Sequence, residues 1–196
     1  MNASRLEAFS DGVIAIIITV MVLELRQPAG ATFHALRATA PSFFAYALSF
    51  VEIAIYWINH HSLLKTVRRL SAGVLWSNLH LLFWLSLFPF ATAWMEENHF
   101  SRDTVATYGV VLVMAAVSYT VLLFSIMRDY DKDSTLRRAI GRDLKGKWSL
   151  GAYLASIPLA FAWPWASVAL FVAVSVTWFI PDRRLEKAIA ESALSD

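Results

Sequence analysis

Charged and polar residues stand at the head of a strongly apolar run near the start of the chain, "RLEAFSDGVIAIIITVMVLEL". Arg5, Ser10 and Asp11 precede the apolar residues, and Glu24 follows them. Ionisable groups at the edge of an apolar helix are costly unless they have partners. Arg5 and Asp11 are too far round a helix to pair with each other. We therefore expect their partners on other helices or on another copy of the chain.

The same run also carries one continuous helical stripe. Its members recur at three- and four-residue spacing, which places them on one face of a helix: Arg5, Phe9, Gly12, Ile16, Val20 (or Thr19) and Leu23.

A second set of polar residues lies in two later apolar segments. One segment ends with Trp57, Asn59, His60 and His61, and the next begins with Asn78 and His80. We expect this set at the same depth as Arg5, Ser10 and Asp11, so that Asp11 accepts a hydrogen bond from Arg5, Ser10, His60 or an indole N–H. A metal site of His60, His61 and His80 is the competing interpretation. No carboxylate at suitable spacing joins these histidines, so no metal site is predicted.

Glu52 lies inside an apolar segment, about half a membrane thickness from its polar end. It is a candidate proton-titrating group, because the surroundings of a carboxyl at that depth decide whether it holds its proton. The alternative is a structural carboxyl, neutral or hydrogen-bonded to Ser49, Tyr56 or a neighbouring helix.

The composition indicates the elements that position these residues. Of the 196 residues 58% are hydrophobic and only 16% are charged, which is typical of a membrane protein. Windows of about 20 apolar residues predict an all-α protein with six spans, at 4–25, 41–64, 74–95, 104–127, 148–163 and 165–181. The last two are short and divided at Trp163-Pro164-Trp165, so one long kinked helix is the alternative there. We expect a single membrane domain, 1–196.

The lysine and arginine positions agree with six spans. Of the 17 such residues, only Arg26, Arg37 and Arg102 fall on one side, and the other fourteen fall on the side of the chain termini. Short cytoplasmic loops collect positive charge, so both termini are predicted to be cytoplasmic. A cleaved secretory signal ending near Ala29-Gly30-Ala31 is disfavoured, because Glu7 and Asp11 stand where a signal carries positive charge.

The stretch "RLEAFSDG" reproduces the R-x-x-x-F-S-D-G signature of the transmembrane protein 175 family, the lysosomal and bacterial potassium channels. "WINHHSLL", "LWSNLHLLFWLSLFPFATAW" and "IPDRR" resemble the same family more loosely. The signature occurs once, so the chain resembles the bacterial form, which assembles as a homotetramer in the cell (inner) membrane. An apolar residue is expected of the family at Glu52.

The resemblance implies that the first span lines the pore. An apolar constriction would then fall on Ile16, Val20 and Leu23, with the Thr19 hydroxyl beside it. Val20 is smaller than the leucine common in bacterial members, which leaves the width of that layer open. An apolar ring has no ligands that could replace the hydration shell of an ion, so it favours K⁺ over Na⁺ only weakly. The signature and its surroundings take a structural role: Arg5, Phe9, Ser10, Asp11, Gly12, Trp57, His60, His61, Asn78 and His80.

The expected function is therefore a potassium channel, and the expected partners are K⁺, the lipid bilayer and further copies of the chain. A secondary transporter or a proton-permeable channel is the alternative; transporters usually show internal repeats, and none is visible. Enzyme motifs such as H-E-x-x-H and G-x-S-x-G are absent from the sequence. No enzyme activity, cofactor or nucleic-acid partner is expected.

Overall fold

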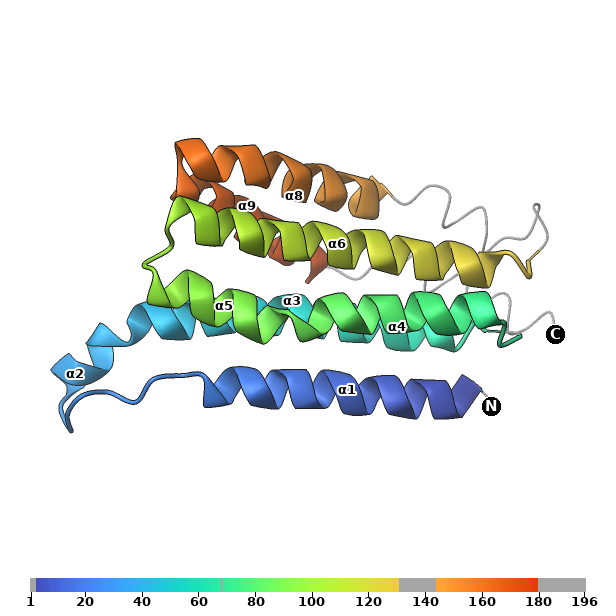
Figure 1. Ribbon diagram of the computed structural model, residues 1–196, viewed down its shortest axis with the longest axis horizontal. Helices are drawn as coiled ribbons and strands as arrows, with labels where there is room; N and C mark the ends of the chain where they lie inside the picture. Colours follow the sequence, from blue (N-terminus) through green and yellow to red (C-terminus); the bar gives the residue numbers. More distant parts are fainter. Residues whose placement is uncertain (1–2, 68, 131–143, 180–196) are drawn as a thin grey trace.

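The computed structural model describes residues 3–67, 69–130 and 144–179. This part of the chain is an elongated bundle of helices and contains no β-strand. Figure 1 shows α1 (Ala3–Leu23) along one edge of the bundle and α8 (Leu144–Ala162) along the opposite edge, with α6 (Arg102–Met127) between them. The protein is therefore all-α, as the composition predicts.

The remaining helices complete the bundle. They are α2 (Phe33–Ala38), α3 (Ala40–Leu64), α4 (Ala72–Ser86), α5 (Phe88–Glu97) and α9 (Pro164–Trp178). Helices thus cover the six predicted ranges to within a few residues, except where those ranges leave the described part. The end of the last predicted range, the motif "IPDRR" and most of the basic connection 128–148 lie outside the described residues.

Prolines and hydroxyl side chains mark where the helices begin. Pro41, Pro89 and Pro164 occupy the first turns of α3, α5 and α9, where a missing N–H costs nothing. Thr32 caps α2 and Ser71 caps α4, each accepting a bond from a backbone N–H of the first turn. Because of Pro89, the third predicted range consists of two consecutive helices that meet at Leu87.

The last two helices form an antiparallel hairpin that turns at Trp163, so the alternative of one long kinked helix is wrong. Ser167 of α9 donates a hydrogen bond to the backbone oxygen of Ser156 in α8 at 2.8 Å. The hairpin packs against α6, the central helix, which also contacts α4 and α5. At this contact Gly109 lies so close to Ser156 that an added Cβ would meet its Oγ at 3.0 Å.

An aromatic contact holds the turns at the end of the bundle away from the N-terminus. His99 and Phe100, between α5 and α6, have positive φ angles of 52° and 56°. Residues other than glycine rarely adopt this backbone region. The Phe100 ring is buried and stacks on Trp165 in the first turn of α9, with ring centroids 4.8 Å apart. The ring of Phe44 in α3 also approaches Phe100, with centroids 6.0 Å apart.

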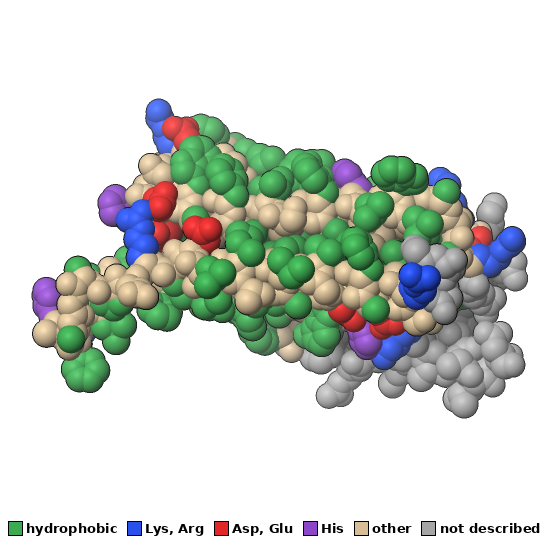
Figure 2. Space-filling model, turned by 60° about the horizontal axis from the view of Figure 1, so that its bottom comes forward, with side chains coloured by type: hydrophobic (Ala, Val, Ile, Leu, Met, Phe, Trp, Pro, Cys, Tyr) green, Lys and Arg blue, Asp and Glu red, His purple; other side chains and the backbone are tan. Residues whose placement is uncertain are grey.

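The distribution of side chains fits a protein that crosses a bilayer. In the view of Figure 2, the ionisable side chains gather mainly toward the two ends of the bundle and a broad apolar surface lies between them. Four stretches of the described chain are long and apolar enough to span a membrane: α1, α3, α4 with α5, and α6. Helix α9 is a shorter apolar helix.

Candidate functional site

The predicted stripe of α1 is the face that this helix turns away from the bundle. The opposite face packs against α3, α4 and α5 and buries Leu6, Ser10, Ile14, Ile17 and Met21. On the stripe, Ile16 is 63% exposed and Leu23 is 80% exposed. The other stripe members are also exposed: Arg5, Phe9, Gly12, Thr19 and Val20. A single chain therefore leaves the apolar part of this face, with Ile16, Val20 and Leu23, exposed.

Thr19 adds a polar group to that face. Its hydroxyl donates to the backbone oxygen of Ala15, one turn earlier. The hydroxyl hydrogen is thus used within the helix, and the lone pairs of the oxygen remain directed outward as acceptors.

A buried polar chain joins the head of α1 to α3 and α4. Asn78 of α4 donates to Ser10 Oγ at 3.0 Å, and its Oδ1 lies 2.7 Å from His60 Nε2 on α3. Ser10 in turn donates to the Leu6 backbone oxygen at 2.9 Å. All three side chains are fully buried, so each lost bond would leave a polar atom without water to replace it.

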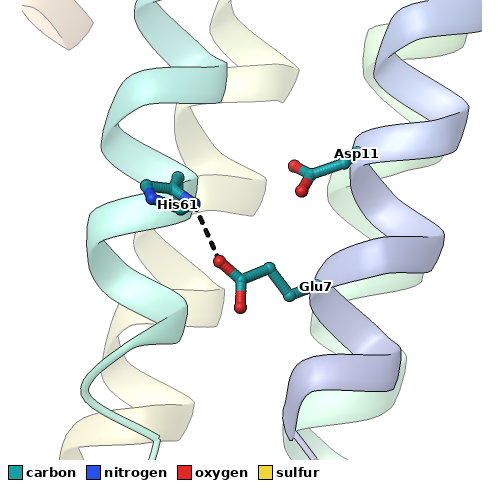
Figure 3. Close-up of side chains that lie close together, drawn as sticks. All are labelled: Glu7, Asp11 and His61. Carbon is teal, nitrogen blue, oxygen red and sulfur yellow. Dashed lines mark ion pairs between the residues drawn. The ribbon is translucent and has the colours of Figure 1, made fainter.

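Two further contacts lie beside this chain, nearer the surface. Trp57 donates its indole N–H to Asp11 at 2.9 Å. Figure 3 shows Glu7 and Asp11 projecting from α1 toward His61 of α3, with His61 Nδ1 2.7 Å from the Glu7 carboxylate. The pair is ionic when His61 is protonated. Together these contacts fasten the first three turns of α1 to α3.

Glu7, Asp11 and His61 also form a group with metal-ligating side chains. Within the described part, their ligand atoms lie within 4.8 Å of one another. The three-histidine metal site, which the sequence disfavours, is not formed by His60, His61 and His80, because His80 bonds other residues. Its Nδ1 lies 2.9 Å from Ser118 Oγ on α6, and its Nε2 accepts from the Trp84 indole at 3.1 Å. His80 thus joins α4 to α6 rather than to the head of α1.

Glu52 is 1% exposed and faces α8 and α9. Tyr153 Oη lies 2.9 and 3.1 Å from its two carboxyl oxygens, and Ser175 donates to one of them at 2.8 Å. The partners are therefore on neighbouring helices and are not Ser49 or Tyr56. Ser49 instead bonds Thr92 at 2.7 Å and Tyr108 at 2.9 Å.

Comparisons with known proteins identify the class of protein. A family model described as the endosomal/lysosomal potassium channel TMEM175 matches residues 5–89. A crystal structure of a lysosomal potassium-selective channel TMEM175 homolog from Chamaesiphon minutus superposes with a TM-score of 0.79 and 28% identity, covering 90% of this chain and 95% of that one. The fold is thus that of an all-α, multi-pass membrane channel.

Two bacterial relatives identify the family within this class of membrane channels. A potassium channel of Chryseobacterium sp. strain P1-3 is 46% identical over 192 residues, which cover 98% of this chain and all of that protein. A potassium channel of Streptomyces collinus is 34% identical over 82% of this chain and 84% of its own length. The chain belongs to the TMEM175 family of ion channels.

An animal member of the family is more distant. The human endosomal/lysosomal proton channel TMEM175 is 28% identical over 138 residues, which span 27% of its length. The family consists of ion channels and is not a class of enzymes.

Proposed function

We propose that the chain forms a potassium-permeable channel as a homotetramer whose pore is lined by the exposed stripe of α1. The observation that carries this proposal is the two-sided character of α1. One face packs on α3, α4 and α5, while the other leaves Ile16 and Leu23 more than half exposed. Arg5 stands at one end of that stripe and Glu24 just beyond the other.

The constriction is assigned to Ile16, Val20 and Leu23. Their apolar side chains offer an ion no ligands, so passage depends on how much hydration water the ion sheds. K⁺ is less strongly hydrated than Na⁺, so a ring of this kind favours K⁺ modestly. The Thr19 oxygen, whose hydrogen is used by Ala15, provides one acceptor for a partly dehydrated cation.

The proposed topology has six spans with both termini on the cytoplasmic side of a bacterial inner membrane. Lys65, Arg69 and Arg128 follow helices that end near the N-terminus in Figure 1, whereas Arg26 and Arg102 lie at the other end of the bundle. This is the distribution that the positive-inside rule requires. The sequence contains no cysteine, so single cysteines introduced near each terminus would report its side by labelling.

Ion flux in lipid vesicles tests the pore assignment. Under a K⁺ gradient the purified protein is expected to pass K⁺ faster than Na⁺, and Ile16→Ser is expected to bring the two rates close together. Val22→Ser is the matched control, since Val22 is also exposed on α1 but lies about 120° round the helix from Ile16. Equal loss of preference in both variants, or equal K⁺ and Na⁺ flux in the unaltered protein, would refute the assignment.

The same vesicles test whether Glu52 makes conduction depend on pH. Glu52 bonds α8 and α9, and in Figure 1 α8 lies on the opposite edge of the bundle from α1. An effect of Glu52 on conduction would therefore act through the packing of α3. The comparison is the K⁺ flux of Glu52→Gln across pH with that of the unaltered chain. An identical pH response removes Glu52 as a titrating group of the channel.

A further inference from the structure

Two carboxylates and an imidazole converge where the head of α1 meets α3. Glu7 and Asp11 are one helical turn apart on α1, and both project toward His61 of α3 (Figure 3). One ligand atom from each of the three residues lies within 4.8 Å of the other two. Sequence spacing alone does not reveal this group, because the carboxylates and the histidine come from different helices.

The charges of this group are not balanced by its own members. Glu7 and Asp11 are at i and i+4, a spacing at which like charges on a helix repel each other. A protonated His61 supplies one positive charge against two negative ones. Arg5 stands about 160° round α1 from Glu7, on the exposed stripe. A divalent cation between the three side chains would neutralise both carboxylates and leave the imidazole uncharged.

The nitrogen of His61 that faces Glu7 forms no hydrogen bond within the described residues. This atom, Nδ1, is buried and lies 2.7 Å from the Glu7 carboxylate, but the two groups are not aligned as donor and acceptor. Buried polar atoms in native proteins are nearly always hydrogen-bonded, so this nitrogen needs another kind of partner. An uncharged imidazole nitrogen is the commonest metal ligand in proteins.

Trp57 orients two of the three side chains. Its indole N–H donates to Oδ1 of Asp11 at 2.9 Å, which uses one of the two oxygens of that carboxylate. Its ring stacks on the His61 ring, with centroids 6.0 Å apart and an angle of 24° between the planes. Partners of this kind around a metal ion fix the direction of its ligands, and their loss typically lowers metal affinity.

The three side chains need only a small adjustment to surround one ion. Bonds of about 2.0–2.2 Å to a tetrahedral Zn²⁺ place its ligand atoms about 3.3 Å apart. The separation of 2.7 Å between Glu7 and His61 and the upper limit of 4.8 Å for the group lie on either side of that value. The side chains of His61 and Glu7 are 37% and 25% exposed, so they can rotate without disturbing the core and an ion from water can reach them.

We propose that Glu7, Asp11 and His61 form a binding site for a divalent transition-metal ion of the Zn²⁺ type. Mg²⁺ and Ca²⁺ prefer sites made entirely of oxygen, whereas an imidazole with carboxylates suits Zn²⁺. Three protein ligands leave a fourth position for water. The bound ion joins the head of α1 to α3. The site is built within one chain, so it depends neither on the proposed pore nor on tetramer assembly.

Titration with Zn²⁺ tests the proposal on the full chain, purified in detergent without a histidine tag. Calorimetry is expected to show one Zn²⁺ per chain, and Mg²⁺ is expected to bind at least tenfold more weakly. Saturating Zn²⁺ is also expected to raise the midpoint of thermal unfolding, because it binds the folded chain. His61→Gln is expected to weaken Zn²⁺ binding about tenfold or more. His34→Gln is the matched control, since His34 is exposed on α2 at the other end of the bundle.

Glu7→Gln keeps the test decisive if His61→Gln destabilises the protein. It removes the charge of the most accessible carboxylate and keeps the length of the side chain, and we expect it to weaken Zn²⁺ binding about tenfold or more. Failure of the unaltered chain to bind Zn²⁺ saturably would refute the proposal. So would unchanged Zn²⁺ affinity in His61→Gln or Glu7→Gln, an equal loss in His34→Gln, or Mg²⁺ binding as tight as that of Zn²⁺. These readouts are independent of ion flux.

Discussion

Helices α1 and α6 are both apolar and long enough to cross a membrane, yet they use their side chains in opposite ways. Five of the 21 residues of α1 are buried, against thirteen of the 26 residues of α6. The buried residues of α6 cover most of its circumference, because the helix contacts α4, α5, α8 and α9. Only a narrow side of α6, with Val110, Val121 and Phe124, is exposed. Hydropathy does not separate these roles, because an apolar side chain suits a protein core, a lipid surface and a dry constriction equally well. The difference lies in the packing, because α1 contacts its neighbours along one face only.

The close packing of α6 predicts the largest effect of substitution. Gly109→Val adds a Cβ that meets Ser156 at 3.0 Å, Ile157 at 3.4 Å and Phe171 at 3.5 Å. Overpacking at such a contact is expected to lower the free energy of unfolding by about 3 kcal/mol. Thermal unfolding in detergent, followed by gel filtration, measures the loss.

Gly151→Val is the matched control, since nothing lies within 4 Å of a Cβ added at Gly151 in α8. Its midpoint of unfolding should stay near that of the unaltered chain. Equal midpoints for Gly109→Val and Gly151→Val would contradict the close packing of α6 against α8.

The attachment of α1 predicts an intermediate effect. Asn78→Ala removes two hydrogen bonds, one to Ser10 and one to His60. Bonds of this kind within membranes contribute about 0.6 kcal/mol each on average and at most about 1.7, so we expect a loss of about 1–2 kcal/mol. Chemical unfolding in mixed micelles measures it.

Ser62→Ala is the control for that substitution, because among the described residues the Ser62 hydroxyl bonds only the Ile58 backbone oxygen of its own helix. A loss in Ser62→Ala as large as that in Asn78→Ala would show that the interhelical bonds are not the cause.

The loop end of α1 predicts the smallest effect. Arg26 and Glu97 form an ion pair with side chains 61% and 49% exposed. The hydrogen bond and charge of Glu97 raise the pKa of Arg26, so the pair stays charged wherever the carboxylate is ionised. Exposed pairs contribute little because water and salt screen them. Arg26→Gln should therefore leave the unfolding midpoint unchanged; a clear fall would mean that this loop helps to hold α1.

The positions of the helices could be predicted well from the sequence, because their signals are local. Apolar length places the spans, and residues such as Pro41 and Pro164 mark helix starts. Helix α2 could not be predicted in this way, since its six residues are too few for a periodic signal. Pro89 was the only sequence signal for the division at Leu87. The position of a proline does not fix the start of a helix, because a helix tolerates proline anywhere in its first turn.

Side-chain partners were harder to predict, because they depend on how each helix is rotated against its neighbours. The sequence placed Ser10, Asp11, His60 and Asn78 at a common depth, and the structure brings these four residues together near the head of α1. It gave no sign that His80 turns toward Ser118 on α6. Glu7 was overlooked as a contact of His61, although it lies one helical turn before Asp11.

The sequence allowed a partner of Glu52 on a neighbouring helix, but the particular residues could not be predicted for the same reason. Tyr153 and Ser175 lie more than 100 residues further along the chain, and no local pattern connects them to α3. The hydrogen-bonded partners of buried groups are thus a tertiary property, whereas the need for a partner can be predicted from burial and charge alone.

The stacked ring of Phe100 also limits how the bundle can move. Its turn is held in a backbone conformation that costs of order 1 kcal/mol or more per residue, and burial of the ring against Trp165 offsets that cost. Phe100 thus works as a latch between the α5–α6 turn and the first turn of α9. Sliding of one hairpin past the other would first have to open this latch, so that end of the bundle is expected to move as one rigid block.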